Sequence, residues 1–315
     1  MKTVRVHNYG SYEQLHYEDA IPPEINENQV LIKVYAASVN HLEIKGTSGV
    51  MKESMPLSFP WIPGYDFAGV VENVGLNVTN LIKGDKVYGN CMGGSYAEYL
   101  AADIHKTVKM PENLTFAEAS SVPHVGETAW QALYKHGRLQ KGETVLIHGG
   151  AGAVGGFAIQ FAHNTGAKVL STASGDDIPF VKSLGADDVV DFRTQDFASI
   201  FKDVDLVLCL VGGNVEEKSY SVLKKRGKLV STVGLSYQDI AKQKEIEAIA
   251  MGIEQSAIDL KSITDLIKVG KVKTDIGISY PLKDVVTAWK ALAGDKSVKH
   301  PSHGKIILEV SGKSI

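Results

Sequence analysis

TVLIHGGAGAVGGFAIQFAHNTG, residues 144 to 166, is the stretch that decides the fold of this chain. Its apolar start, Thr144–Ile147, predicts a buried strand, and apolar residues at 154, 157, 158, 161 and 162 predict a helix. Between them, Gly150, Gly152 and Gly155 have the G-x-G-x-x-G spacing. In this context the glycines allow a tight turn, close approach of a pyrophosphate and close packing of helix on strand. The stretch predicts a dinucleotide site; a glycine-rich loop without a ligand is the alternative.

Composition narrows the class of protein. The chain has 315 residues, 44% hydrophobic and 22% charged, which favours about two globular domains. A net charge of -3 argues against nucleic acid or an anionic membrane as the main partner. Cys91 and Cys209 form no C-x-x-C pattern, the start MKTVRVHNYG has no apolar signal core, and no run of about 18 apolar residues occurs. We expect a cytoplasmic enzyme without a membrane span.

The first third of the chain has a β-rich pattern. Short β-prone runs alternate with turn signals such as Pro22-Pro23 and Pro63-Gly64, which predicts an antiparallel, barrel-like domain. The predicted strands are Thr3–His7, Val30–Ala37, Phe67–Val74, Lys86–Gly89 and Glu98–Ala101.

From about residue 123 strands and helices alternate. After a helix over Glu127–His136 and the opening stretch, the predicted strands are Lys168–Ala173, Asp188–Asp191, Asp205–Val211 and Lys228–Val233. The predicted helices between them are Ile178–Leu184, Phe197–Lys202 and Val215–Lys224. Nearly continuous apolar strands suit a parallel sheet covered on both faces, so this part is predicted to be a doubly wound nucleotide-binding domain.

The last part of the chain is predicted to return to the β-rich domain. Helices are expected over Asp259–Val269 and Leu282–Leu292, a strand-like segment over Lys273–Tyr280, and a final strand over Lys305–Val310 that is too isolated to form a domain alone. The predicted organisation is therefore a first domain over 1–122, a nucleotide-binding domain over 123–258, and a return segment over 259–315.

An ordered series of motifs resembles the medium-chain dehydrogenase/reductase superfamily, in its zinc-independent quinone oxidoreductase (zeta-crystallin-like) branch. The series runs AASVNHLEIKG, PWIPGYDFAGVVENVG, KGDKVYG, GSYAEYL, GETAWQAL, IHGGAGAVGGFAIQFA, KSLGADDVVDF, VGG, GKLVSTVG and HGKIILEV. The resemblance covers essentially the whole chain. It implies a Rossmann domain that binds NADP(H), a GroES-like catalytic domain, and a homodimer joined through the edges of the nucleotide-domain sheets, to which the segment 273–280 is expected to contribute.

The positions of the catalytic zinc ligands in zinc-dependent relatives match Ser38 and the pair Tyr65-Asp66. A serine and a phenol are poor zinc ligands beside thiolate and imidazole, and the four-cysteine lobe of those relatives is absent. His41 and Glu43 are metal-ligand candidates by type, but we interpret them as a loop histidine and a surface carboxylate. We therefore predict no metal site.

The expected cofactor is NADPH rather than NADH. The second strand of the nucleotide domain is followed by Ser174, where an NAD-preferring chain usually carries an acid, so a 2′-phosphate has room. Against this, Asp176 and Asp177 follow instead of a lysine or arginine. Arg193 is expected to supply the missing positive charge, with an ordinary exposed arginine as the alternative.

The resemblance implies the other cofactor contacts. Asn40 and Thr128 are expected beside the nicotinamide, and Lys305 close to the cofactor. The turn residues include Ala153 and Val154, and the edge of the sheet supplies Leu210, Val211, Gly212, Val233 and Gly234.

Without a metal, hydride donation to an electron-poor acceptor is the expected chemistry, and Asn40 and Tyr65 are the catalytic candidates, with His41 as another possible acid. The leading prediction is an NADPH-dependent quinone reductase. The alternatives are an alkenal/enone reductase and an NADPH-binding protein with a structural or RNA-binding role. Quinones and enones are both small electrophilic acceptors, and we expect a molecule of this kind as the partner.

Overall fold

Strand β8 (Thr144–His148) lies inside a six-stranded parallel sheet of order β10-β9-β8-β11-β12-β13. The other strands are β9 (Lys168–Ala173), β10 (Asp188–Asp191), β11 (Val204–Cys209), β12 (Leu223–Ser231) and β13 (Glu247–Ala250). In chain order this is the 3-2-1-4-5-6 arrangement of a dinucleotide-binding fold, with the reversal point between β8 and β11. The doubly wound sheet predicted from the sequence is confirmed.

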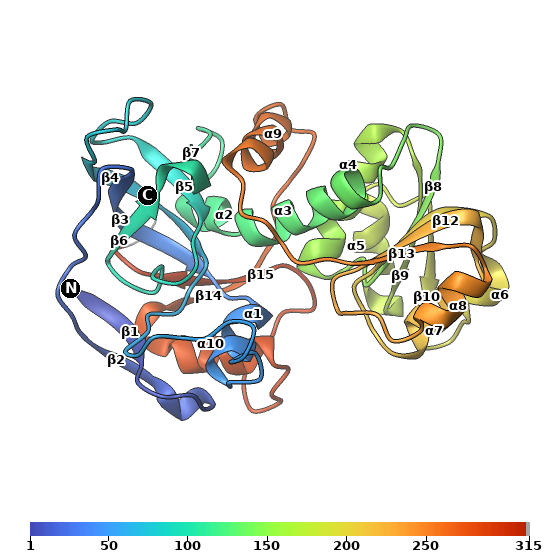
Figure 1. Ribbon diagram of the computed structural model, residues 1–315, viewed down its shortest axis with the longest axis horizontal. Coiled ribbons are helices and arrows are strands. Elements are labelled where there is room, and N and C mark those ends of the chain that lie inside the picture. The colour runs from blue at the N-terminus through green and yellow to red at the C-terminus, as the bar shows by residue number, and fades with distance from the viewer. Residues whose placement is uncertain (313–315) are drawn as a thin grey trace. The chain divides into compact units, whose positions relative to one another are not determined.

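The computed structural model describes residues 1–312 and separates into two units (Figure 1). Unit 1 comprises Met1–His124, Gln255–Lys268 and the chain from Thr274 onward; unit 2 comprises Val125–Glu254 and Val269–Lys273. The domain boundaries predicted from the sequence remain predictions. None of the helices among residues 1–312 is both long and apolar enough to cross a membrane.

Helices cover both faces of the sheet in unit 2. They are α4 (Ala153–Thr165), α5 (Ile178–Ser183), α6 (Phe197–Ile200), α7 (Asn214–Ser219) and α8 (Gln238–Gln243). Figure 1 shows α4 and α5 on one side of the sheet and α6, α7 and α8 on the other. Helix α4 ends at Gly166, whose φ of 81° is the left-handed conformation that glycine accepts readily. The apolar strands thus lie between two helical layers, as their continuous burial requires.

Unit 1 is built on a seven-stranded sheet and a separate hairpin. The order β14-β15-β3-β4-β5-β7, with β6 paired to β3, joins β3 (Gln29–Ser38), β4 (Asp66–Val74), β5 (Lys86–Asn90), β6 (Tyr99–Asp103), β7 (Thr107–Lys109), β14 (Ile276–Pro281) and β15 (Lys305–Glu309). Strands β1 (Lys2–Val6) and β2 (Leu15–Asp19) pair with each other. The helices are α1 (His41–Thr47), α2 (Phe116–Ser120), α9 (Ala257–Lys268) and α10 (Val285–Leu292), and α3 (Pro123–Trp130) begins in this unit.

The return of the last strand to the first part of the chain positions the site in unit 1. Strand β15 pairs antiparallel with β3, with Ile307 opposite Ser38. Around α10, Trp289 is fully buried in a core that also contains Tyr96, and its ring N–H donates to the Tyr96 hydroxyl over 3.4 Å. This packing places the start of β15 beside the end of β3.

Several predicted elements were wrong in extent. The helix predicted over Val215–Lys224 ends at Ser219, because the Val204 N–H bonds to the Val222 carbonyl and Leu223 already opens β12. The helix predicted to start at Glu127 starts at Pro123 and continues as a π-helical turn over Gln131–His136. Strands β2, β7 and β13 were not predicted.

Candidate functional site

The glycine turn after β8 is held by hydrogen bonds to the backbone of unit 2. The Gly150 N–H donates to the Thr172 carbonyl over 3.0 Å, and the Gly152 N–H to the Gly149 carbonyl over 3.0 Å. A Cβ on Gly150 would lie 2.2 Å from Ser171 Oγ, and one on Gly155 would lie 2.2 Å from the Gly149 oxygen. These two glycines are therefore required by the packing of the protein itself.

Gly152 is less restricted by the packing of the protein than these two glycines. A Cβ there would approach only the Gly149 oxygen, at 3.3 Å, which requires a shift of a few tenths of an ångström. Gly152 is the N-cap of α4, where unpaired N–H groups of the first helical turn point outward. This cradle fits the pyrophosphate of a dinucleotide, which binds helix N-termini through such N–H groups.

The carboxyl edge of the same sheet adds an apolar wall. Val211 and Val233 follow β11 and β12 and are 45% and 46% exposed. A Cβ on Gly149 would lie 3.5 Å from Val211, and one on Gly212 would lie 3.5 Å from Val233. The structure thus brings several predicted residues to the reversal point of the strand order, where open α/β sheets bind ligands.

The corner after β9 carries more acid than expected. Ser174 donates its hydroxyl to Asp177 over 2.5 Å, and a Cβ on Gly175 would lie 2.8 Å from the Asp191 carboxylate. The Arg193 guanidinium lies over the Phe192 ring at 5.7 Å from its centroid. Ser174 and Arg193 thus follow the paired ends of β9 and β10, where Asp191 lies opposite Ala173, and the carboxylates of Asp177 and Asp191 lie at this corner.

Unit 1 contains a buried polar cluster around Asn40, the N-cap of α1. Its Nδ2 donates to Glu43 Oε1 over 3.1 Å and to Asp66 Oδ2 over 3.0 Å, and its Oδ1 accepts from Lys305 Nζ over 2.5 Å. Ser38 donates its hydroxyl to Asp66 Oδ2 over 2.5 Å. All five side chains are at most 5% exposed. The cluster holds two carboxyl groups and one amine away from water.

Burial shifts the titration of this cluster. It raises the pKa of Glu43 to about 8, although N–H donors from Asn40 and Tyr65 favour the carboxylate. Burial lowers the pKa of Lys305, against the attraction of Asp66 and Glu43. A neutral Glu43 reduces the negative charge that this cluster holds away from water.

Glu43 and His41 were misinterpreted. Glu43 is fully buried rather than on the surface, and His41 is exposed at the first position of α1 rather than in a loop. The Asn40 N–H donates to Glu43 Oε2 over 2.6 Å, which closes the reciprocal arrangement of a capping box. The spacing N-x-x-E before the helix is the signal that would have identified Glu43.

Tyr65 is buried beside a methionine. Its hydroxyl donates to Met55 Sδ over 3.6 Å, and its ring stacks on His124 at 6.0 Å between centroids. Burial raises the pKa of Tyr65, and burial lowers the pKa of His124 to about 4. At neutral pH the phenol keeps its proton and the imidazole is uncharged. The catalytic role of Tyr65 remains a prediction.

The residues at the zinc-ligand positions do not fit a zinc site. The Asp66 carboxylate already accepts from Ser38, from Asn40 and from the His124 N–H over 2.7 Å. Tyr65 faces Met55. Within residues 1–312, no three His, Cys, Asp or Glu side chains gather in a way that would hold a metal ion.

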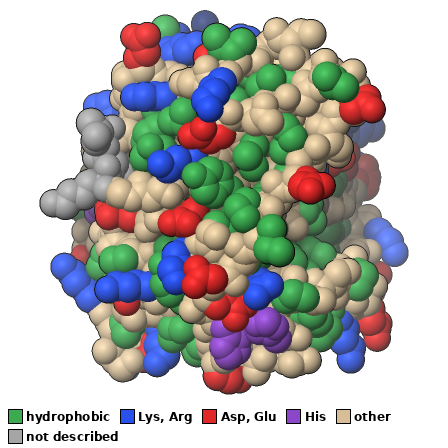
Figure 2. All heavy atoms as spheres, turned by 90° about the vertical axis from the view of Figure 1, so that its left-hand side faces the viewer, with side chains coloured by type: hydrophobic (Ala, Val, Ile, Leu, Met, Phe, Trp, Pro, Cys, Tyr) green, Lys and Arg blue, Asp and Glu red, His purple; other side chains and the backbone are tan. Residues whose placement is uncertain are grey.

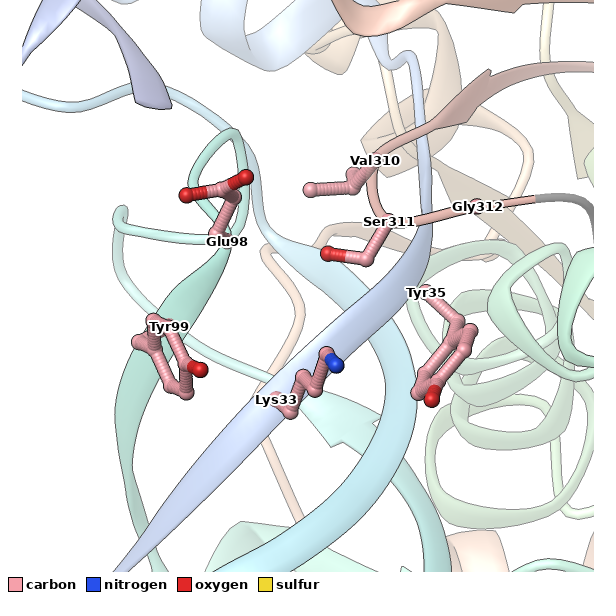
Figure 3. A pocket seen from close by; sticks show the side chains of 7 residues that line it. All are labelled: Lys33, Tyr35, Glu98, Tyr99, Val310, Ser311 and Gly312. Carbon is pink, nitrogen blue, oxygen red and sulfur yellow. The ribbon is translucent and has the colours of Figure 1, made fainter. Parts of the chain in front are cut away.

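A separate pocket of about 610 Å³ lies in unit 1 (Figure 3). Lys33 and Tyr35 of β3 line it together with Glu98, Tyr99 and Val310–Gly312. The Lys33 ammonium lies 5.7 Å from the centroid of the Tyr35 ring. None of the predicted site residues lines this pocket, so it adds nothing to the predicted chemistry.

Thr128 lies in α3 and is 8% exposed, and Leu210 and Gly234 follow β11 and β12. No pattern in the sequence indicated the roles of Ser171, which packs against Gly150, and of Thr172, which accepts from the N–H groups of Gly149 and Gly150. Both are hydroxyl residues in a strand, and their contacts depend on the pairing of β9 with β8.

Comparison with known proteins places these features in a family. A family model described as an alcohol dehydrogenase GroES-like domain matches residues 26–112, and one described as a zinc-binding dehydrogenase matches residues 184–308. Human quinone oxidoreductase is 32% identical over 91% of this chain and 92% of its own length.

Two plant reductases are more similar over a shorter stretch. A 2-methylene-furan-3-one reductase from Solanum lycopersicum is 40% identical, and an NADPH-dependent alkenal/one oxidoreductase from Arabidopsis thaliana is 38% identical. Each match covers 74% of this chain, but only 62% and 63% of the respective relative.

Solved structures agree over the full length. The quinone oxidoreductase of Coxiella burnetii has a TM-score of 0.89 and 34% identity, and covers 99% of both chains. The Escherichia coli quinone oxidoreductase complexed with NADPH has a TM-score of 0.87 and 25% identity, over 98% of this chain and 100% of the other.

Proposed function

We propose a function for this chain from one premise: it belongs to the quinone oxidoreductase branch of the medium-chain dehydrogenase/reductase superfamily. It is an NAD(P)-dependent oxidoreductase of the quinone oxidoreductase or alkenal/enone reductase type. The proposed activity is NADPH-dependent, zinc-independent hydride donation to quinones. The observation that carries it is the glycine turn that opens α4 at Gly152, in a chain that resembles quinone oxidoreductases along its whole length.

The proposed cofactor is NADPH, which supplies the hydride when bound. The N–H groups around Gly152, Ala153 and Val154 would hold its pyrophosphate, since they open the first turn of α4. Ser174 and Arg193 are the proposed contacts of the 2′-phosphate. The remaining proposed cofactor contacts, whose roles follow from the resemblance, are Asn40, Thr128, Leu210, Val211, Gly212, Val233 and Gly234. Lys305 is proposed close to the cofactor rather than in contact with it.

The cluster in unit 1 supports an indirect role for Lys305. Its ammonium donates to the Val39 carbonyl over 2.8 Å and to the Asn40 side chain, and it lies 4.0 Å from Asp66. We therefore propose that Lys305 acts on the cofactor through Asn40. Zinc independence is supported by the donor set, in which a serine and a phenol stand at the ligand positions.

A second candidate function is reduction of an activated carbon–carbon double bond. The two plant reductases named for enone-type substrates are more identical to this chain than human quinone oxidoreductase is, over the part that aligns. Both reactions begin with hydride donation to an electron-poor acceptor. They differ in the proton that an enone requires at carbon, whereas a quinone takes its protons on oxygen from water.

A nucleic-acid role is disfavoured by the charges of unit 1. Figure 2 shows a face of the molecule on which basic and acidic side chains are interspersed. Ion pairs of unit 1 such as Lys83 with Glu72 and Lys109 with Asp85 likewise join side chains of opposite charge. Basic side chains do not form a continuous stripe across that face, as binding of a nucleic-acid phosphate backbone would require.

The test is oxidation of NADPH by the purified protein across a panel of simple quinones and α,β-unsaturated aldehydes and ketones, with and without a chelator. The proposal expects turnover of quinones, little response to the chelator and a lower KM for NADPH than for NADH. Turnover confined to enones would select the second candidate. Tight NADPH binding with no turnover of any acceptor would contradict both.

Assembly and location remain proposals. A homodimer is expected from the resemblance, but the segment 273–280 does not contribute a strand to the nucleotide-binding sheet: β14 pairs with β15 in unit 1, and the edges of the unit 2 sheet are β10 and β13. A cytoplasmic location is likewise proposed, while one of the relatives is named as chloroplastic.

A further inference from the structure

The side chain of His148, the last residue of β8, joins two elements of unit 2 and takes no part in the proposed chemistry. It is 1% exposed. Its Nδ1 lies 3.1 Å from the hydroxyl of Thr172 in β9, and its Nε2 lies 2.9 Å from the hydroxyl of Ser219 in α7. The ring also packs edge-on against Phe197 at 4.5 Å between centroids.

The neighbours of His148 determine which ring nitrogen carries the hydrogen. Ser219 Oγ lies 2.6 Å from the Val215 carbonyl, which only accepts, so the single hydroxyl hydrogen of Ser219 is committed there. The contact between Nε2 and Ser219 must then use a hydrogen on Nε2. Burial lowers the pKa of His148 to about 3, so the ring is neutral and Nδ1 is an acceptor.

The same reasoning fixes the hydroxyl of Thr172. Because Nδ1 accepts, the Thr172 hydroxyl donates its hydrogen to His148. Its oxygen is then free to accept the N–H of Gly149, which lies 3.3 Å away. The Thr172 carbonyl accepts the next N–H along, that of Gly150, over 3.0 Å. One threonine therefore holds the first two peptide groups of the glycine turn.

We propose that His148 is a positioning residue for cofactor binding, which fixes the Thr172 hydroxyl and through it the glycine turn that receives the pyrophosphate. This inference rests on the proposed binding of NADPH. The hydrogen-bond chain runs in one direction on each side of the ring: from His148 Nε2 to Ser219 and on to Val215, and from Gly149 to Thr172 and on to Nδ1. A side chain that lacks the acceptor at Nδ1 leaves the Thr172 hydroxyl without its partner.

Three substitutions separate the two sides of the ring. His148→Phe keeps a ring against Phe197 but removes both hydrogen bonds. His148→Asn places a carboxamide oxygen near the position of Nδ1 and keeps the acceptor for Thr172. Thr172→Val removes the hydroxyl that contacts Gly149 while keeping a β-branched side chain in the strand. Thr165→Val is the matched control, because its hydroxyl bonds to Phe161 at the far end of α4.

The readout is the dissociation constant of NADPH, compared with that of adenosine 2′-monophosphate, which lacks the pyrophosphate. We expect His148→Phe and Thr172→Val to weaken NADPH binding by about threefold to tenfold, as loss of a buried hydrogen bond does. Binding of adenosine 2′-monophosphate is expected to be unchanged, His148→Asn to recover most of the affinity, and Thr165→Val to bind NADPH as the unmodified protein does.

Equal weakening of both ligands, or unchanged NADPH binding by Thr172→Val, would overturn the inference. The imidazole ¹⁵N signals of the ligand-free protein give an independent test that does not need a variant that folds. A protonated Nε2 with a bare Nδ1 supports the chain of hydrogen bonds, and the opposite tautomer refutes it. Failure of the unmodified protein to bind NADPH would instead refute the proposed function, whatever the tautomer.

Discussion

The ammonium of Lys305 lies 2.5 Å from the carboxamide oxygen of Asn40, and this contact decides which way the amide faces. A cation accepts no hydrogen bond, so the oxygen must point to Lys305 and the nitrogen to Glu43 and Asp66. Both hydrogens of the Asn40 amide are therefore used within the protein.

Replacing Lys305 should destabilise unit 1 strongly. Lys305→Met leaves the buried carboxylate of Asp66 without its counter-charge and the Asn40 oxygen without its donor. Breaking a buried pair by removing one partner typically lowers the free energy of unfolding by about 3 to 5 kcal/mol. Urea unfolding followed by fluorescence measures this loss.

The matched control for Lys305→Met is Lys296→Met, at an exposed position of the same unit. It should change the free energy of unfolding by less than about 0.5 kcal/mol. The double variant Lys305→Met with Asp66→Asn should recover part of the loss, because it removes the unpaired charge. A double variant no more stable than Lys305→Met would show that the charge pair is not the cause.

The stability of the protein should depend on pH through Glu43. Its pKa is raised by burial from about 4.5 to about 8, so the folded protein binds more protons than the unfolded chain between those values. The contribution of Glu43 is therefore largest at low pH and declines as the pH rises towards about 8. Glu43→Gln removes the titrating group, and the free energy of unfolding should then fall less steeply between about pH 5 and about pH 8.

Glu53→Gln is the control for this pH series, since Glu53 is an exposed carboxylate in the loop that follows α1. Its pH profile should run parallel to that of the unmodified protein. A Glu43→Gln profile that also runs parallel would mean that the N–H donors of Asn40 and Tyr65 outweigh burial, and that Glu43 is a carboxylate in the folded protein.

The glycine turn should tolerate a methyl group at one glycine and not at another. In Gly150→Ala the new Cβ would lie 2.2 Å from Ser171 Oγ, so the turn must shift, and we expect at least a tenfold rise in the dissociation constant of NADPH. In Gly156→Ala the new Cβ would lie 3.4 Å from Leu184, in ordinary contact. That variant should bind NADPH normally and be slightly more stable, because alanine favours the helix.

Calorimetric titration of NADPH into both variants makes this comparison. Adding Ser171→Ala to Gly150→Ala removes the atom nearest to the new methyl group and should restore part of the affinity. Equal affinities of the two glycine variants would show that the turn adapts, and that the contact with Ser171 does not restrict it.

The local features of the chain could be predicted from its sequence, because their causes lie close together. The glycine turn needs only a strand, three glycines and a helix within 23 residues, and it was predicted correctly together with the parallel sheet. Strand β13 escaped prediction because it is a four-residue strand at the edge of the sheet, and two of its residues are alanines, which have low β-propensity.

The polar cluster could not be predicted, because it depends on contacts between distant parts of the chain. Lys305 reaches Asn40 only because β15 pairs with β3, and Asp66 is brought there by the pairing of β4 with β3. The N-x-x-E spacing marks Glu43 as a capping acid of α1 but does not show that it is buried. Its contact with Tyr65, whose backbone N–H donates to it over 3.2 Å, joins it to another part of the chain.

The preference between NADPH and NADH should respond to Asp177, which accepts the hydroxyl hydrogen of Ser174. Asp177→Asn removes a carboxylate that repels a 2′-phosphate, so kcat/KM with NADPH should rise several-fold while that with NADH changes little. Arg193→Ala should act in the opposite direction and raise the KM for NADPH about tenfold. Asp239→Asn serves as the control, because Asp239 lies in α8, which is not in the half of the sheet that contains β9 and β10. Steady-state kinetics with both cofactors test this. If Asp177→Asn raises kcat/KM with NADH, and Arg193→Ala leaves the KM for NADPH unchanged, the 2′-phosphate binds elsewhere.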